Sequence, residues 1–212
     1  MTTKERLLAA TLRVLAEQGI AKVSARTIAA EAGVNQALVF YHYGSIDDLL
    51  AAACDAGSAA RVDAHRDAVA RVGSVAELVA LARRIHAEER REGSVAVIGQ
   101  LLAGASSHPT LAEPTARGLE RWVVEVERTL TRLLSATVLA DLPPDHPSAV
   151  DVAGLARALS AAFVGLELYE GVDAAGADAA FDALEQVARL VGVLEQLGPL
   201  ERAAVRRRLR RG

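Results

Sequence analysis

Residues 23–45 read VSARTIAAEAGVNQALVFYHYGS, and this stretch encodes two short helices joined by a tight turn. Ser24 carries a hydroxyl that can cap the first helix, and the apolar residues that follow it recur at helical spacing. Gly33 comes after the last of them, where helices commonly end with a residue in the left-handed conformation. A second helix at about 36–42 follows at once, so the stretch predicts a helix-turn-helix.

The side chains of this stretch suit a helix that reads DNA. Such a helix needs groups at its N-terminal end that bond to base edges, and flanking polar groups that reach phosphates. Gln36 and Asn35 can each bond bidentately to adenine, whereas Val39 and Phe40 are candidates for the core. Ordinary surface polarity is the alternative for the polar residues, but it does not account for their spacing. We predict DNA contacts at Ser24, Arg26, Thr27, Asn35, Gln36, Ala37, Leu38, Tyr41 and His42.

Residues 5–50 resemble the DNA-binding domain of the TetR-like (tetracycline-repressor) family of bacterial transcriptional regulators. The resemblance rests on matches in a single register, at Gly19, Ser24, Ile28, Ala29, Ala32, Gly33, Val34, Tyr41, His42, Tyr43, Ser45, Leu49 and Leu50. Ile46 stands where the family usually has a phosphate-binding lysine, and Phe40 stands where it usually has a tyrosine. Both departures weaken the expected grip on the DNA backbone. The candidates to compensate are Lys4, Arg6 and Lys22.

The composition predicts an all-α fold. Of the 212 residues 51% are hydrophobic but only 3% aromatic, so the core is built from Ala, Leu and Val. We predict an N-terminal three-helix helix-turn-helix DNA-binding domain at residues 1–46 and a C-terminal helical ligand-binding and dimerisation domain at residues 47–212. Further helices are expected at about 3–18, 46–71, from 75, from 94, from 114 (with Pro114 in the first turn), at 148–171 and at 177–197, with a proline-broken loop at 140–147.

Two of the expected helices carry more apolar surface than one packing partner needs. In the helix at about 177–197, one stripe contains Phe181, Leu184, Ala188 and Val191, and an adjacent stripe contains Val187, Leu190, Leu194 and Leu197. Such wide faces predict a four-helix bundle across a two-fold axis, and the resemblance implies the same homodimer. A larger monomeric core is the alternative. We predict the interface at Leu155, Leu159, Phe163, Phe181, Leu184, Ala188 and Val191.

The resemblance also implies a pocket for a small-molecule effector among the middle helices. The effector would shift the DNA-reading heads through the helix at 46–71, because it binds the DNA-incompetent conformation more tightly. For any single pocket residue, a role in the core is the alternative. The scarcity of aromatic residues favours an apolar or amphipathic effector. We predict ligand contacts at His86, Gln100, Trp122, Val126, Phe163 and Tyr169.

We predict no enzyme, which is the competing class. Acid-pair catalysis at Glu88 and Glu89, or at Glu167 with Glu170, is the alternative that stays open, although these carboxylates are typical of solvated helix faces. The 5 histidines lack metal-binding spacing, and neither a Gly-rich phosphate loop nor a nucleophile elbow is present, so we predict no cofactor and no metal. Cys54 is the single cysteine, which suits a reducing, cytoplasmic compartment. The N-terminus lacks a signal-peptide core, and no uninterrupted apolar run reaches the ~20 residues of a membrane span.

Basic and acidic residues balance over residues 1–50, which predicts weak non-specific DNA binding and dependence on a dimer. The Arg-rich C-terminal end is either a solvated helix end, which we favour, or a surface for nucleic acid or an acidic partner. The whole pattern predicts a DNA-binding transcriptional regulator. The resemblance implies a repressor that a small molecule releases from a palindromic operator. The alternative is a helical small-molecule-binding or scaffold dimer that has lost specific DNA binding.

Overall fold

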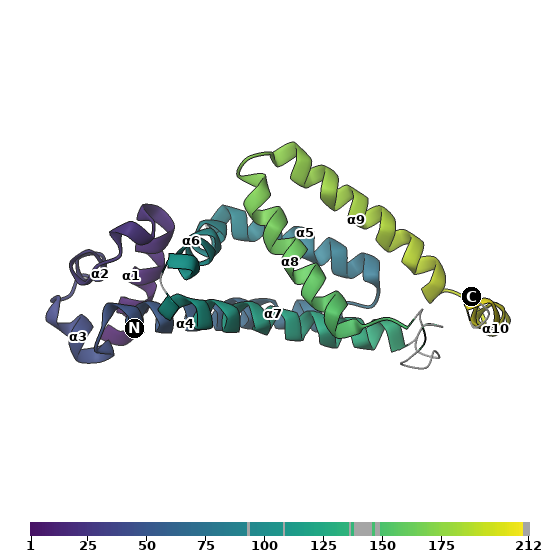
Figure 1. Cartoon of the computed structure of the whole chain (residues 1–212), viewed down its shortest axis with the longest axis horizontal. Helices are drawn as coiled ribbons and strands as arrows, with labels where there is room; N and C mark the ends of the chain where they lie inside the picture. The colour runs from purple at the N-terminus through teal and green to yellow at the C-terminus, as the bar shows by residue number, and fades with distance from the viewer. Residues whose placement is uncertain (93, 108, 136, 138–145, 147–148, 210–212) are drawn as a thin grey trace. The chain divides into compact units, whose positions relative to one another are not determined.

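The computed structural model describes the chain except residues 93, 108, 136, 138–145, 147–148 and 210–212. All regular structure in the described residues is helical, which confirms the predicted all-α fold (Figure 1). The predicted loop at 140–147 lies outside the described residues except for His146. The helices are α1 (Thr3–Gln18), the 3₁₀ turn η1 (Ile20–Lys22), α2 (Ala25–Ala32), α3 (Ala37–Tyr43), α4 (Ile46–Arg71), α5 (Val75–Glu92), α6 (Ser94–Ser107), α7 (Pro109–Ser135), α8 (Val152–Glu170), α9 (Ala174–Glu195) and α10 (Pro199–Leu209).

The chain folds into two compact units, each built from segments that are distant in sequence. The first unit contains Met1–Ala64 and Glu88–Trp122, and the second contains His65–Ala87 and Val123–Gly212. Helix α6 and the first part of α7 therefore belong to the same unit as the helix-turn-helix. The functional division at residues 1–46 and 47–212 stays a prediction.

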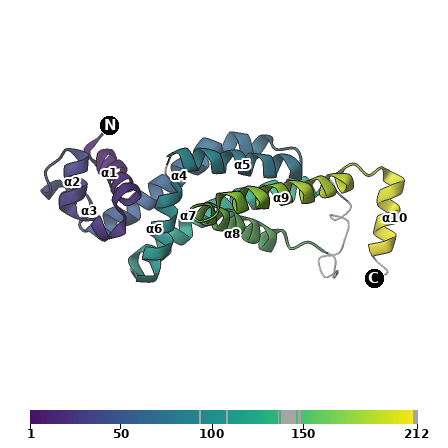
Figure 2. The ribbon, with the colours of Figure 1, turned by 90° about the horizontal axis from the view of Figure 1, so that it is seen from above.

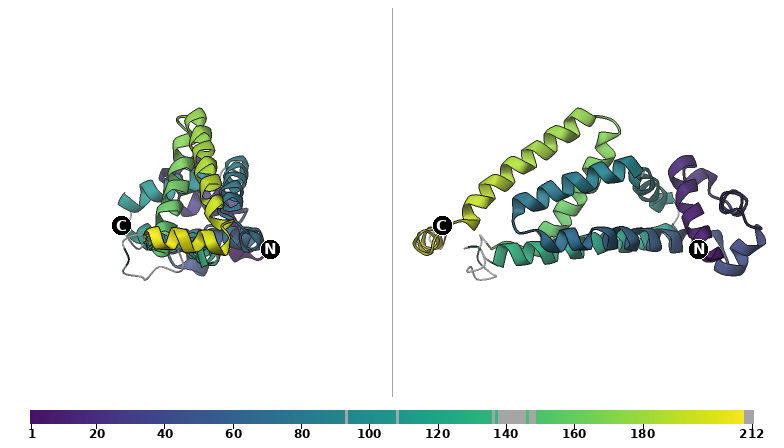
Figure 3. Two further views of the ribbon diagram at one scale, coloured as in Figure 1. Left: turned by 90° about the vertical axis from the view of Figure 1, so that its right-hand side faces the viewer. Right: turned by 180° about the vertical axis from the view of Figure 1, so that it is seen from behind.

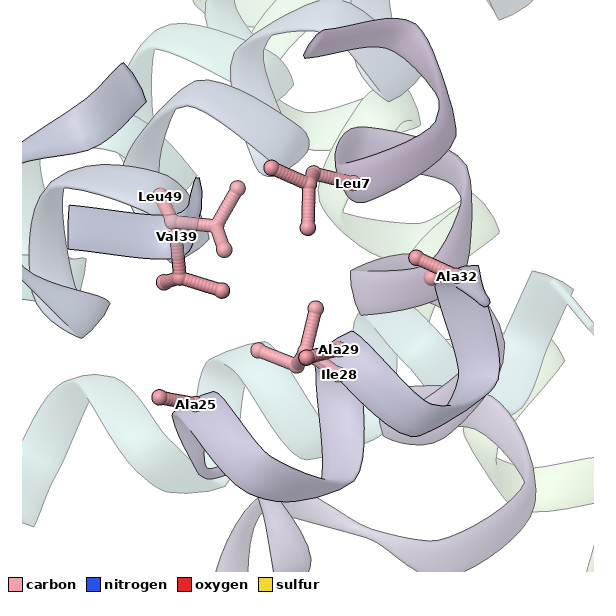
Figure 4. Close-up of a cluster of buried hydrophobic side chains, with 8 residues drawn as sticks. Leu7, Ala25, Ile28, Ala29, Ala32, Val39 and Leu49 are labelled. Atoms are coloured by element: carbon pink, nitrogen blue, oxygen red, sulfur yellow. The ribbon is translucent and has the colours of Figure 1, made fainter. Parts of the chain in front are cut away.

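Helices α1, α2 and α3 and the start of α4 enclose one small apolar core, which we call the head core. Figure 4 shows these side chains pointing toward one another from all four helices. Because α2 and α3 are too short to be stable alone, this shared core holds them. The head core consists of Leu7, Ala10, Ala25, Ile28, Ala29, Ala32, Val39 and Leu49.

A second apolar cluster joins α6 to α1, α4 and α7 within the first unit. Burial raises the pKa of the Cys54 thiol in this cluster to about 11, so Cys54 stays protonated and packs as a small apolar residue. The cluster consists of Leu15, Leu50, Cys54, Val97, Leu101 and Leu111, and Leu12, Ala16, Ile20 and Val23 pack against it.

Three expected helix starts were wrong, and local chemistry explains each. Helix α7 begins at Pro109, whose fixed φ suits a first turn, so Pro114 lies inside the helix instead of at its start. Helices α8 and α9 begin after Asp151 and Asp173, which cap them by accepting the backbone N–H groups three residues on, both at 2.9 Å. A carboxylate at an N-cap satisfies donors that the helix itself leaves free.

In the second unit, α8 and α9 are joined by a short turn and pack against each other near it (Figures 2 and 3). The first half of α8 also packs against α7, around Val123, Leu130 and Ala156. Arg132 of α7 closes the end of α4, because its guanidinium donates to the carbonyls of Ala70 at 2.6 Å and of Val72 at 2.9 Å. Cations at a helix C-terminus satisfy its last carbonyl groups.

Candidate nucleic-acid interface

Helix α2 starts at the cap that its sequence predicts. Ser24 Oγ accepts the backbone N–H of Thr27 at 3.1 Å, and the two side-chain hydroxyls are 2.7 Å apart. Both residues are half-buried. Their hydroxyls therefore stabilise the start of α2, and contacts of these two residues with DNA stay a prediction.

The turn after α2 closes in the way that glycine allows. Gly33 is left-handed, with φ 63° and ψ 41°, and its N–H donates to the carbonyl of Ala30 at 3.1 Å. The N–H of Val34 donates to the carbonyl of Ala29 at 2.9 Å, which completes the paired bonds of a Schellman end. This geometry sends the chain directly into α3.

Two arginines of α1 bind α2 and the turn at its end. Arg6 Nη2 donates to the carbonyls of Ala32 at 2.5 Å and Gly33 at 3.0 Å, and Arg13 Nε lies 2.6 Å from Glu31 Oε1. Arg6, a candidate to compensate for the missing phosphate contact, is therefore used inside the head. Among the cations of residues 1–50, Lys4, Arg13, Lys22 and Arg26 are exposed, and of these Arg13 is paired with Glu31.

Helix α3 presents one face outward, which we call the reading face and define as Gln36, Ala37, Phe40 and Tyr41. All four are exposed, Tyr41 by 80% and Phe40 by 48%, whereas Val39 between them is fully buried. The four positions lie on one side of a helix because they are separated by one turn. Leu38 and His42 are half-buried, and the His42 ring contacts the Tyr41 ring edge-on at 5.0 Å.

The side chain of Asn35 caps α3, whereas the side chain of Gln36 does not. Asn35 Oδ1 accepts the backbone N–H of Ala37 at 2.8 Å and so begins α3. Bidentate pairing with adenine needs both the amide oxygen and the amide nitrogen, so this bond competes with base reading by Asn35. Gln36 is exposed and makes no capping bond with its side chain. Gln36 is therefore the stronger candidate for a base contact.

Sequence reasoning left out Phe40, which stands on the reading face rather than in the core. Its spacing of four residues from Gln36 is the signal that places both on one face. Tyr43, by contrast, faces inward: its hydroxyl donates to the carbonyl of Lys4 at 3.1 Å, and burial raises its pKa. Ile46 is half-buried against the head core, so the residue that replaces the family's usual lysine contributes packing.

A capped short helix, a glycine turn and a second helix with an exposed polar end form a helix-turn-helix of the DNA-binding type. Residues 7–53 match the model of the family described as bacterial regulatory proteins, tetR family. This segment is a tetR-family DNA-binding domain. Among curated proteins, no sequence matches this chain.

Solved structures extend the likeness beyond residues 7–53. A protein of Streptomyces coelicolor A3(2), described as a transcriptional regulator, is 26% identical with a TM-score of 0.67, over 88% of this chain and 98% of its own. A TetR-family regulator from Rhodococcus sp. is 20% identical with a TM-score of 0.71, over 92% of this chain and 98% of its own. The multidrug binding protein EbrR, complexed with imidazole, is 26% identical with a TM-score of 0.60, over 89% and 96%. These likenesses extend the shared helical fold over most of the chain, and the matched domain at residues 7–53 supports a DNA-binding regulator.

Two of the predicted effector residues meet in the second unit. His86 is 7% exposed, and its ring lies 6.2 Å from the ring of Phe163 and 5.0 Å from that of Phe181. His86 Nε2 is 2.8 Å from Glu170 Oε2, while its buried Nδ1 has no hydrogen-bond partner among the described residues. Aromatic rings beside one polar atom without a hydrogen-bond partner, here His86 Nδ1, can bind and orient a small ligand.

The other predicted effector residues lie elsewhere. Val126 packs with the apolar residues of α7 and α8. Tyr169 is 51% exposed, and its hydroxyl donates to Asp173 Oδ2 at 3.2 Å, so it stands at the surface. Gln100 and Trp122 belong to the first unit, where Gln100 binds the backbone of Ile20.

The predicted dimer residues are buried to different degrees in the protomer. Phe181 and Ala188 are each 1% exposed, and the predicted residues Leu155, Leu159, Phe163, Leu184 and Val191 are half-buried. On α9 the described large apolar residues that are exposed are Val187 at 56% and Leu190 at 70%, from the adjacent stripe, and Val193 at 60% beside them. We call these three residues the exposed stripe of α9. The interface at the seven predicted residues stays a prediction.

Arg121 of α7 binds two residues of α4 within the first unit. Its Nη1 donates to Asp55 Oδ1 at 2.9 Å and to Ser58 Oγ at 2.8 Å. The bond to Asp55 lowers the pKa of the Asp55 carboxyl. A carboxylate whose pKa is lowered by folding stabilises the protein above its unfolded pKa, and this contribution disappears as pH falls through the folded value.

We expect Arg121→Met to lower the free energy of unfolding by about 1 kcal/mol at pH 7, because the pair is partly exposed. The difference from the unsubstituted protein should shrink as pH falls below about 3.9, the ordinary pKa of Asp, because the unfolded chain then binds a proton that the folded Asp55 resists. Urea unfolding at pH 7 and pH 3 measures it. Arg128→Met is the control, since Arg128 is 70% exposed and pairs with Glu125 at 3.1 Å on its own helix. A loss that is equal at both pH values would contradict the role of Asp55.

Proposed function

We propose that this chain is a TetR-like regulator, a cytoplasmic homodimeric repressor that binds a palindromic operator and leaves it when a small molecule binds. The exposed reading face of α3 is the observation that carries the DNA part of the proposal. Four neighbouring residues of a very short helix stay outside the head core, although Phe40 and Tyr41 are large and in part apolar. A groove in DNA is a surface that would cover them.

The chemistry of the reading face suits the edges of A·T pairs. Gln36 can bond bidentately to adenine, and the Phe40 ring can contact the methyl group of thymine. Ala37 is short enough for the helix to approach the bases closely. Tyr41 and His42 at one edge, and the exposed Lys22 and Arg26 nearby in sequence, are candidates for phosphate contacts.

The head provides few cations for non-specific binding, since Arg6 and Arg13 are engaged within it. Affinity that rests on phosphate contacts falls steeply with salt, so a single head should bind weakly. We therefore propose that two heads act together on half-sites roughly one helical turn of DNA apart. The exposed stripe of α9 is the proposed dimer surface. Helix α8 is proposed to contribute to this surface, because only 11% of its most apolar part is buried in the protomer. Helix α8 has the length and composition of a membrane span, but core helices share both properties.

For the effector, we propose a site around His86, Phe163 and Phe181. The aromatic rings would pack on an apolar or amphipathic ligand, and His86 Nδ1 would bond to a polar atom of it. Binding of a ligand changes operator affinity only as far as it favours one conformation over the other. EbrR, described as a multidrug binding protein, offers a parallel among similar structures.

Selection of binding sites from a random duplex library at near-physiological salt tests the proposal. An enriched inverted repeat would support a dimeric DNA reader, and the operator so found allows screening for ligands that release it. Recovery of no enriched site would overturn the DNA-binding part. It would favour the alternative of a helical small-molecule-binding or scaffold dimer.

We expect Gln36→Ala to relax base preference at one position in each half-site, by roughly 1–3 kcal/mol. The reason is the loss of one bidentate contact. Repeating the selection with the variant measures the change. Gln18→Ala is the matched control, because Gln18 is an exposed glutamine of the same head on α1. An unchanged preferred sequence in the Gln36 variant would show that Gln36 does not read a base.

A further inference from the structure

Helix α6 holds the backbone of the connection between α1 and α2. Gln100 Oε1 accepts the N–H of Ile20 at 3.1 Å, a bond that spans eighty residues of sequence. The chain reverses at Gly19, whose φ is +78°, and a Cβ at Gly19 would lie 3.4 Å from Gln100 Oε1. Glycine at this position allows the positive φ, and the Gln100 amide lies at van der Waals distance from where a Cβ would stand.

One turn after Gln100 on α6, Gly104 leaves room for the side chain of Ile20. A Cβ at Gly104 would overlap Ile20 Cδ1 and would lie 3.2 Å from Leu111 Cδ1. Ile20 also packs against the apolar cluster that contains Leu15 and Leu101. Helix α6 therefore holds Ile20 twice, through its backbone N–H and through its side chain.

This connection leads directly into the helix-turn-helix. Ile20 lies in η1, and Val23 after it packs against both the head core and the α6 cluster. The next residue, Ser24, caps α2. A shift of α6 would therefore move residues 20–23 and with them the start of α2. The Gly33 turn links α2 to the reading face, which would move as well.

We propose that Gln100 and Gly104 form a clamp by which α6 positions the DNA-reading helices, which makes Gln100 a positioning residue for operator binding. This inference rests on the proposed function. It assigns a different role to Gln100, which is predicted above to contact an effector, because the Gln100 amide oxygen accepts the N–H of Ile20. A ligand that displaces α6 acts on operator affinity through this clamp.

The test compares Gln100→Leu with Gln100→Glu, using the operator found by selection. Leucine removes the acceptor and is expected to weaken operator binding about tenfold, whereas glutamate keeps an oxygen at the same reach and should bind within about twofold of the unsubstituted protein. Amide hydrogen exchange should accelerate at Ile20 in Gln100→Leu but not in Gln100→Glu. Gln18→Leu is the matched control, since it makes the same substitution at an exposed residue close to the connection.

A compensating pair tests the side-chain half of the clamp and does not depend on how well Gln100→Leu folds. Gly104→Ala should weaken operator binding, because the new methyl group displaces Ile20 Cδ1. Adding Ile20→Val removes that Cδ1 atom and should restore most of the affinity. Loss without restoration would contradict the clamp.

Two results separate failure of the clamp from failure of the proposed function. If the unsubstituted protein selects an operator and Gln100→Leu binds it equally well, with unchanged exchange at Ile20, the clamp is wrong and the proposed function stands. If the unsubstituted protein selects no site at all, the proposed function fails, and the positioning role of Gln100 fails with it.

Discussion

Replacing Leu190 with glutamate is expected to separate the protomers and to weaken operator binding by about a hundredfold or more, because two linked heads bind far more tightly than one. Leu190 is 70% exposed, at the centre of the stripe between Val187 and Val193. A carboxylate there costs nothing in the isolated protomer but would lose its hydration in an apolar interface. Sedimentation velocity measures the dimer, and operator titration measures the affinity.

Two further variants make this result specific. Leu200→Glu introduces the same change at a leucine of α10 that is 87% exposed, and it should leave the dimer intact. Phe181→Glu should unfold the second unit instead, because Phe181 is 1% exposed and packs against His86. If Leu190→Glu remains a dimer, the proposed interface is wrong.

The second large effect is expected from Ile28→Ala, which should lower the free energy of unfolding by about 3 kcal/mol. Ile28 is fully buried in the head core, where the alanine variant leaves a cavity among α1, α3 and α4. Because α3 has only 7 residues, it depends on this core for its structure, and operator binding should fall as well. Urea unfolding followed by the fluorescence of Trp122, the single tryptophan, measures the loss.

Ile46→Ala is the matched control for this experiment. Ile46 is half-buried at the edge of the same core, so the same truncation should cost about 1 kcal/mol. Equal losses for Ile28→Ala and Ile46→Ala would contradict the burial that distinguishes them. A loss of stability in Ile28→Ala with full operator affinity would contradict the dependence of α3 on the head core.

Local features of the sequence predicted much of the fold correctly. The range of α1, the Ser24 cap, the end of α2 at Gly33 and the long α4 after Ser45 all match the structure. Each depends on contacts within a few residues of chain: a hydroxyl that accepts a nearby N–H, or a glycine that tolerates positive φ. Errors occurred where two local signals competed, as at Pro109 and Pro114.

The features that the sequence left open depend on contacts between distant segments. Periodicity revealed two apolar stripes on α9 but not which one covers His86 and which remains exposed. The same limit applies to Tyr169, an aromatic residue expected in a pocket that stands at the surface. For Phe40, helical spacing alone left the core and the exposed face as equal alternatives, and the fully buried Val39 decides between them.

The sequence by itself determined the helical class, the helix-turn-helix and its caps, because these follow from propensity and from bonds between near neighbours. Only the tertiary structure decided the role of Gln100, since nothing near residue 100 indicates that its side chain binds the backbone of Ile20. The same holds for Arg6, which looks like a phosphate contact in the sequence and closes the end of α2 in the fold. A long polar side chain binds whichever unsatisfied backbone group packing brings within reach, and that group is set by the meeting of distant helices.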